Sequence, residues 1–186
     1  MKNILLIPGH GGKDSGAVAA DLREADLALE VALEVANLLR EKYCIYMSRD
    51  RATQYLSPSG QLAMINDICE KVGLEAAIAI HFNASVDPQA HGIETLYRDD
   101  NDFWLAQIIH RNILTDTDLK DRGCKEDVRN LAVFKALPEV PVCLCELGFI
   151  TNPHDHEFIE GLLDKNPETI SVFADSIARA LQEALA

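Results

Sequence analysis

The chain has few basic residues for its number of acidic ones. Its 186 residues include 17 Lys and Arg against 30 Asp and Glu, which gives a formal net charge of -13 at pH 7. Binding to phosphate backbones needs clustered Lys and Arg, so this balance argues against a nucleic-acid partner. It also argues against a purely electrostatic attachment to anionic membranes or wall polymers. An acidic enzyme that acts on such polymers through a local site is still compatible with the charge.

Long apolar runs are also missing. The first run, residues 4–7, is followed at once by Pro8 and Gly9, and it is too short for a membrane span or the core of a signal peptide. It is more typical of a first β-strand. We therefore expect no membrane insertion and synthesis in the cytoplasm without a signal peptide.

The chain lacks the cysteine spacing of a structural zinc site, because its cysteines are odd in number and no paired CxxC occurs. They are Cys44, Cys69, Cys124, Cys143 and Cys145. Cys143 and Cys145 alternate in an apolar stretch that we predict to be a strand, so both side chains should point to one face. We expect all five to be reduced thiols, most of them buried.

The length suits one domain that can bury a core without disulfides or structural metals. A bound metal would therefore serve chemistry rather than folding. With 48% hydrophobic and 25% charged residues, the composition is that of an ordinary globular protein. No internal repeat, low-complexity tract or linker is visible, and we expect a monomer.

Hydrophobic periodicity and turn residues predict strands that alternate with helices. The predicted strands are residues 3–8, 44–48, 76–82, 93–97, 131–134 and 140–147, and the predicted helices are residues 24–42, 58–72, 103–114 and 169–185. Gly73 is the expected C-cap of the second helix. The alternation predicts a single α/β domain with a central twisted, mostly parallel sheet and helices on both faces.

Polar groups that can bind a metal stand at the ends of three predicted strands. His10 follows the first strand in a glycine-rich loop, His81 lies near the end of the third, and Glu146 lies near the end of the last. Sites in open α/β sheets gather at the carboxyl ends of strands. A carboxylate in a strand as apolar as that of Glu146 is costly to bury unless it is paired or linked to a metal.

Each of these residues, taken alone, also has an ordinary structural explanation. Glu24 begins the first long helix, where a carboxylate complements the helix dipole, and Asp21 and Asp26 compete for that role. His10 could cap a turn, and His81 could be a hydrogen-bonded core histidine. Together, two His and a Glu match the ligand set of a catalytic zinc, with a fourth position for water. Zinc lowers the pKa of that water toward ~7, and a nearby carboxylate takes and returns the proton.

Five segments, in chain order, carry a more specific pattern. They are residues 7–17 (IPGHGGKDSGA), 48–50 (SRD), 79–84 (AIHFNA), 92–97 (GIETLY) and 145–152 (CELGFITN). The chain resembles the zinc-dependent N-acetylmuramoyl-L-alanine amidases of the amidase-3 family. The first segment is similar to the family's opening zinc loop, the third to its SIHAN motif, and the last to the motif with its catalytic glutamate.

The resemblance implies hydrolysis of the amide that joins the lactyl group of N-acetylmuramic acid to L-alanine in peptidoglycan. It implies one zinc ion held by His10, Glu24 and His81, which polarises the carbonyl and activates water. Glu146 would act as general base and then pass the proton to the leaving amine. The chain would then be a catalytic domain, residues 1–186, without a separate wall-binding domain.

Several positions depart from the family pattern. Gln61 stands where the family often has Arg in an ERxxxAN-like run, although Asn66 is retained. Ala79 replaces the serine of SIHAN, and Phe82 replaces its second alanine. These changes concern local packing and substrate contacts, and they leave the implied zinc ligands in place.

Candidates for substrate contacts are Asn83, next to the second zinc histidine, and Arg122 and Arg129. We place both arginines in a loop before the strand predicted at residues 131–134, where ordinary surface charge is the competing explanation.

The remaining histidines have weaker assignments. His154 and His156 form a pair that we expect at a solvated helix start, with Asn152 or Asp155 as the cap. His91 precedes Gly92 and could lie near the cleft, whereas His110 falls in a helical pattern and is expected to be structural.

Two other functions stay open. A zinc carboxypeptidase-like peptidase also uses two His and a Glu as ligands, but it usually has the first two as HxxE, whereas His10 and Glu24 are fourteen positions apart (24 minus 10). A non-enzymatic wall-binding module derived from an amidase would not need all four chemistry residues. For the biological role we expect action on the cell wall, as a phage endolysin or a released autolysin. A sporulation amidase also fits.

Overall fold

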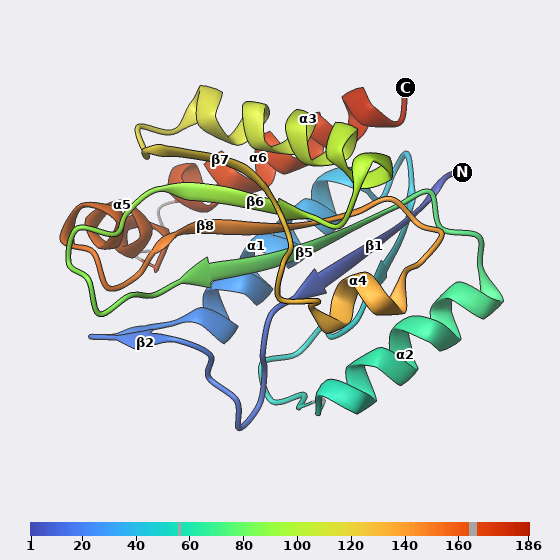
Figure 1. Ribbon diagram of the computed structural model, residues 1–186, viewed down its shortest axis with the longest axis horizontal. Helices are drawn as coiled ribbons and strands as arrows, with labels where there is room; N and C mark the ends of the chain where they lie inside the picture. The colour runs from blue at the N-terminus through green and yellow to red at the C-terminus, as the bar shows by residue number, and fades with distance from the viewer. Residues whose placement is uncertain (56, 164–166) are drawn as a thin grey trace.

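A six-stranded sheet runs through the middle of the molecule in the order β4–β1–β5–β8–β6–β7 (Figure 1). The strands are β1 (Asn3–Pro8), β4 (Cys44–Met47), β5 (Ala76–Asn83), β6 (Ile93–Tyr97), β7 (Asp121–Glu126) and β8 (Val142–Phe149). The first four in this order are parallel, β6 is antiparallel to β8, and β7 is parallel to β6. The computed structural model describes residues 1–55, 57–163 and 167–186.

Side chains on the central strands alternate between two apolar cores. On β1, Ile4 and Leu6 enter one core, whereas Leu5 enters the other. On β5, Ile78 and Ala79 separate in the same way. Strands covered on both faces need apolar residues at every position, which explains why β1, β5 and β8 are nearly continuous apolar runs.

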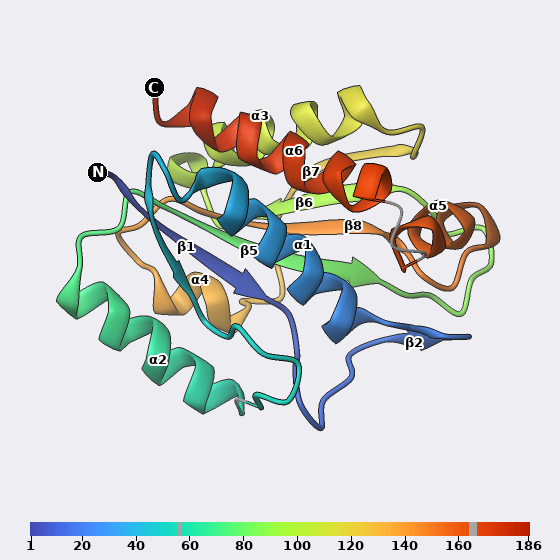
Figure 2. The ribbon, with the colours of Figure 1, turned by 180° about the vertical axis from the view of Figure 1, so that it is seen from behind.

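Helices cover both faces of the sheet, as predicted. The larger core lies under α1 (Glu24–Leu39), α3 (Asp100–Asp116) and α6 (Pro167–Ala184), and the smaller core lies under α2 (Pro58–Lys71) and α4 (Ala132–Ala136) (Figure 2). The helix α5 (Pro153–Leu163) packs against α6 and β8 at one end of the sheet. In the described part of the chain, no helix is both long and apolar enough to cross a membrane.

The start of α1 is fixed by the loop before it. The N-cap Arg23 makes no side-chain cap, and the backbone N–H groups of Glu24 and Ala25 instead donate to the carbonyls of Ala17 and Ser15. These bonds satisfy two of the donors that every helix start leaves open. The helix thus begins at Glu24 and holds that residue against the preceding loop.

Three sequence predictions of local structure are wrong. Residues 131–134, predicted as a strand, are instead the N-cap Leu131 and the first three residues of the helix α4, because a run this short has no readable period. Its Phe134 and Ala136 fill the smaller core. The second helix ends at Lys71 with an extended Val72 as C-cap, so Gly73 is not the cap. Arg122 lies within β7, where we predicted a loop.

Three further strands were missed altogether. The short strands β2 (Val18–Ala19) and β3 (Leu22–Arg23) form a hairpin before α1. The strand β7 has the polar sequence DRGCKE, because it lies at the sheet edge and buries little. Such strands carry no apolar alternation from which they could be predicted.

The cysteines agree with the sequence prediction in part. All five are free, and Cys143 and Cys145 are buried on the same face of β8, in the larger core. The other three are half-buried.

Candidate functional site

His10 lies in the loop after β1 and has a left-handed backbone with φ of 58°, which non-glycine residues rarely adopt. Asp14 orients its ring, since Oδ2 lies 3.0 Å from Nδ1 of His10. Asp14 is held in turn, because its Oδ1 accepts a hydrogen bond from the backbone N–H of Gly16. With Nδ1 engaged, Nε2 of His10 faces the start of α1.

The buried carboxylate of Glu24 joins this histidine to the one on β5. Its Oε2 lies 3.1 Å from Nε2 of His10, and its Oε1 lies 2.8 Å from Nδ1 of His81. The backbone N–H groups of Ala17 and Phe82 each donate a hydrogen bond to one of the two oxygens. Glu24 therefore does more than complement the helix dipole, because its side chain turns into a cluster built from three separate elements.

Two glycines leave space for the cluster. A Cβ on Gly16 would lie 2.5 Å from Oε2 of Glu24, and a Cβ on Gly9 would lie 2.5 Å from Cε1 of His81. Gly16 also has a positive φ of 63°, which disfavours any side chain there. The glycine-rich loop is thus shaped around the three polar side chains.

The surroundings of His10 stabilise a positive charge on its imidazole ring. The hydrogen bond with Glu24 raises the pKa of His10 to about 9, against the opposing effect of burial. Burial by itself would raise the pKa of Glu24, but hydrogen bonds with His10 and His81 outweigh it and hold that pKa well below its usual range. An ionised carboxylate between two imidazoles is also what a metal cation requires.

Glu146 lies on β8 directly beside His81 in the parallel pairing of β5 and β8. Glu146 is 9% exposed, and among the described residues its Oε2 has no hydrogen-bond partner. Burial raises the pKa of this carboxyl, and the charges of Glu24 and Glu94 act in the same direction, while His81 opposes them. A buried carboxylate with an oxygen free of such bonds and a raised pKa suits a group that takes up and releases a proton.

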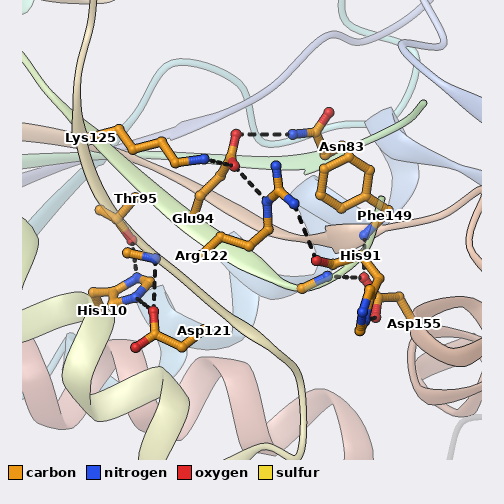
Figure 3. A network of polar contacts seen from close by, with 12 residues as sticks. Asn83, His91, Glu94, Thr95, His110, Asp121, Arg122, Lys125, Phe149 and Asp155 are labelled. Carbon is orange, nitrogen blue, oxygen red and sulfur yellow. Dashed lines mark hydrogen bonds and ion pairs between the residues drawn. The ribbon is translucent and has the colours of Figure 1, made fainter. Parts of the chain in front are cut away.

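Glu94 on β6 is Glu146's neighbour on the other side. Its carboxylate accepts hydrogen bonds from Arg122 Nε at 2.7 Å, Lys125 Nζ at 2.6 Å and Asn83 Nδ2 at 3.3 Å (Figure 3). Although burial acts to raise the pKa of Glu94, the two cations lower it. Of the acidic pair, Glu94 thus has two cations in direct contact, whereas the charges of His81 and Arg129 act on Glu146 without a hydrogen bond to either.

The residues present fit a zinc ion. One nitrogen from each of His10 and His81 and one oxygen from Glu24 lie within 4.8 Å of one another. Two imidazoles and a carboxylate are a common zinc ligand set in hydrolases. The Asp14 carboxylate on the far nitrogen of His10 is the outer-shell contact that metal-binding histidines usually make.

The three predicted substrate contacts lie in different surroundings. Asn83 donates to Glu94 near the cluster, and Arg122 pairs with the same carboxylate while its guanidinium stacks over Phe149 at 4.8 Å from the ring centroid. Arg129 is more exposed and pairs with Asp127 at 3.7 Å.

Sequence reasoning did not single out three residues that shape this site. Asp14 and Glu94 stand inside recognised segments, but their partners are visible only in three dimensions. Arg49 is buried near the end of β4, and its Nη2 donates to the carbonyls of Gly9 and Ala25 at 2.6 Å each. It thereby ties the loop of His10 to the start of α1. The signal available in the sequence was the arginine of the SRD segment, which the structure shows to be buried.

The other histidines lie outside the cluster. Asn152 caps α5 as expected, because its Oδ1 accepts from the N–H groups of His154 and Asp155. The His156 ring hydrogen-bonds to the carbonyl of Ile150. His110 is buried and structural, as predicted. Its ring nitrogens contact Thr95 Oγ1 at 3.0 Å and Asp121 Oδ1 at 2.9 Å (Figure 3).

Comparison with known proteins agrees with the resemblance seen in the sequence. Residues 4–183 match a family model described as N-acetylmuramoyl-L-alanine amidase. The N-acetylmuramoyl-L-alanine amidase CwlM of Bacillus licheniformis is 32% identical over 199 residues, an alignment that covers 100% of this chain and 68% of that protein.

Solved structures agree with these sequence matches. The catalytic domain of CwlV, an N-acetylmuramoyl-L-alanine amidase from Bacillus (Paenibacillus) polymyxa, superimposes with a TM-score of 0.85 at 26% identity and covers 100% of this chain and 98% of that one. An N-acetylmuramoyl-L-alanine amidase from Clostridium difficile 630 has a TM-score of 0.85 at 29% identity, covering 99% and 96%.

Proposed function

Because the chain belongs to the N-acetylmuramoyl-L-alanine amidase family, we propose that it hydrolyses the amide between N-acetylmuramic acid and L-alanine in peptidoglycan with one zinc ion. The observation that carries the zinc part is that His10 Nε2 and His81 Nδ1 both approach the carboxylate of Glu24, beside a Glu146 oxygen that has no hydrogen-bond partner among the described residues.

His10, Glu24 and His81 would hold the zinc, and Asp14 would keep the His10 ring in the ligating orientation. When bound, zinc polarises a carbonyl and makes water more acidic. The negative charge of Glu24 offsets part of the cation's charge, and the buried backbone donors of Ala17 and Phe82 keep its carboxylate in place. The protein thereby supplies a fixed cradle at the end of the sheet.

Glu146 would handle the protons. It takes a proton from the water whose oxygen forms the new bond to the lactyl carbonyl carbon. It then gives that proton to the alanine nitrogen as the carbon–nitrogen bond breaks, so the peptide leaves as a neutral amine. Burial and the neighbouring carboxylates raise the pKa of Glu146. This supports the second step, in which Glu146 acts as an acid and donates the proton to the leaving nitrogen.

Asn83, Arg122 and Arg129 are our proposed substrate contacts. Arg122 and Lys125 bring positive charge to the edge of the site in a chain of net charge -13, and the stem peptide carries carboxylates. Of the three residues, Arg129 has the most exposed side chain and is therefore the freest to meet a carboxylate.

Action on the cell wall as an endolysin or a released autolysin is a further proposal. Relatives described as an N-acetylmuramoyl-L-alanine amidase and as a probable cell wall amidase support wall-directed activity in general and do not separate these roles. Lysis of cells by the expressed protein only after the membrane is permeabilised would support the endolysin role. Growth-phase lysis of an intact producing strain would contradict it.

Digestion of isolated sacculi tests the proposal. Release of intact stem peptides with a free N-terminal alanine supports the amidase, whereas cleavage only between amino acids would support the less favoured peptidase instead. A chelator should abolish the release, and Zn²⁺ should restore it. Full activity in metal-free protein would remove the zinc from the mechanism.

A further inference from the structure

A second group of metal-binding side chains lies apart from the cluster already described. His91 ends the loop between β5 and β6, and His154 and Asp155 lie in the first turn of α5. Their ligand atoms all lie within 4.8 Å of one another. Asp155 Oδ1 is 3.9 Å from His91 Nδ1 and 3.5 Å from His154 Nδ1. Ligands of a tetrahedral ion with bonds of about 2.0–2.2 Å stand at similar separations.

The carboxylate of Asp155 is held with one oxygen toward the two histidines. Asp155 is 0% exposed, and its Oδ2 accepts backbone hydrogen bonds from Gly92 at 2.6 Å and Phe149 at 2.9 Å (Figure 3). Across residues 1–55, 57–163 and 167–186, its ion-pair contacts within 4.0 Å are with His91 and His154. The backbone bonds leave Oδ1 with only two long imidazole contacts among the described residues, and a cation there would stabilise a carboxylate buried this completely.

His91 supplies an independent observation. Its Nδ1 is buried and has no hydrogen-bond partner in the part of the chain that the structure describes, which is costly for a polar nitrogen. Coordination to a cation at Asp155 Oδ1 would satisfy this atom and neutralise the carboxylate at once. His154, whose side chain is 61% exposed, leaves the group open to solvent, so an ion can reach it and keep water as a further ligand.

A metal at this position would join two segments that already touch. Asn152, which caps α5, donates from Nδ2 to the carbonyl of Pro88 at 2.8 Å, and Thr151 exchanges hydrogen bonds with Ser85. These bonds attach the loop of residues 84–92 to the junction of β8 and α5. An ion between His91 and α5 would close the far end of the same loop.

We propose that His91, His154 and Asp155 form a second site, for a divalent transition metal such as Zn²⁺, which clamps residues 84–92 to the start of α5. Imidazole nitrogen with one carboxylate favours zinc, nickel or copper over calcium or magnesium. The site shares no residue with His10, Glu24 and His81.

Equilibrium dialysis against Zn²⁺, followed by metal analysis, tests the proposal on the full chain. The proteins compared are the parent, His81→Ala, His91→Ala and the double variant. We expect two ions per chain in the parent, one in each single variant and none in the double variant. If His91→Ala binds as much zinc as the parent, the second site is overturned. If His81→Ala does so, the first site fails instead, so the two failures are distinguishable.

His156→Ala is the matched control, because His156 lies on the same turn of α5 but bonds to Ile150. It should bind as many ions as the parent, and loss of an ion there would overturn the assignment to His91 and His154. Because His91→Ala could lose zinc by misfolding, the ring ¹⁵N shifts of His154 are followed in the His81→Ala protein as zinc is added. A shift confirms ligation, and unchanged signals overturn it.

Discussion

Glu94 and Glu146 lie directly opposite each other in the antiparallel pair of β6 and β8, yet their partners differ completely. Arg122 and Lys125 neutralise Glu94, whereas Oε2 of Glu146 has no hydrogen-bond partner within residues 1–55, 57–163 and 167–186. Like charges directly opposite on a sheet repel each other. One carboxylate is thus kept ionised by cations, and the pKa of the other is raised, above all by burial.

Glu94→Gln tests how much the cation pair stabilises the fold. The pKa of Glu94 is lowered in the folded state, so its contribution is present above the unfolded value of about 4.3 and disappears as pH falls through the lower folded value. We expect the substitution to cost about 1–2 kcal/mol at pH 7 and progressively less as the pH falls below about 4.3 toward 3. Urea unfolding across this range measures it, with the exposed Glu126→Gln as control. An equal loss at both pH values would contradict the prediction.

Glu146→Gln should separate catalysis from folding. Removal of a general base typically lowers the rate roughly 100- to 10,000-fold. The free energy of unfolding should not fall, because the substitution removes a buried charge without a partner. Sacculus hydrolysis, thermal unfolding and zinc content are measured on the same preparation. A variant that hydrolyses sacculi as fast as the parent would leave Glu146 without its proposed role.

Asp14→Asn should weaken zinc binding while the loop stays folded. The amide can still accept from the N–H of Gly16, but it no longer offers His10 a charged partner. Changes in such outer-shell contacts commonly cost about 10- to 100-fold in metal affinity. Competition with a zinc chelator measures the affinity, and the exposed Asp67→Asn serves as control. Equal affinities for both variants would show that Asp14 does not support the ligand.

Gly16→Ala should damage the cluster by steric conflict. The new Cβ would lie 2.5 Å from Glu24 Oε2 at a residue with φ of 63°. We expect about 1–3 kcal/mol of destabilisation together with loss of zinc binding. Gly73→Ala is the matched control, because a Cβ there meets no atom within 4 Å, and its cost should stay within about 0.5 kcal/mol. Similar thermal midpoints for the two variants would contradict this account.

The sequence predicted the central strands well, because strands buried on both faces consist of apolar residues. It failed at β7, a polar edge strand, and at α4, whose five residues show no period. His10, His81 and Glu146 were found because strand ends concentrate polar groups, and Glu24 needed the family resemblance. The structure brings these four together, while their metal and catalytic roles stay predictions.

The supporting residues could not be predicted in the same way. Arg49 donates hydrogen bonds to the carbonyls of Gly9 and Ala25, which lie 40 and 24 positions away in the chain. Glu94 depends on cations 28 and 31 positions away. Contacts over such separations are set by the packing of the sheet, and a linear pattern of residue types does not encode them.

The alternation of side chains on β5 and β8 up to His81 and Glu146 limits how this protein can change in length. Ile80 and Cys145 are buried in the larger core. His81 and Glu146 are the next residues along their strands, so their side chains point away from that core. Deletion of one residue within either strand would turn the functional side chain into that core and an apolar one outward. Length changes compatible with activity should therefore be confined to connecting segments such as residues 84–91, however permissive the strands are to substitution.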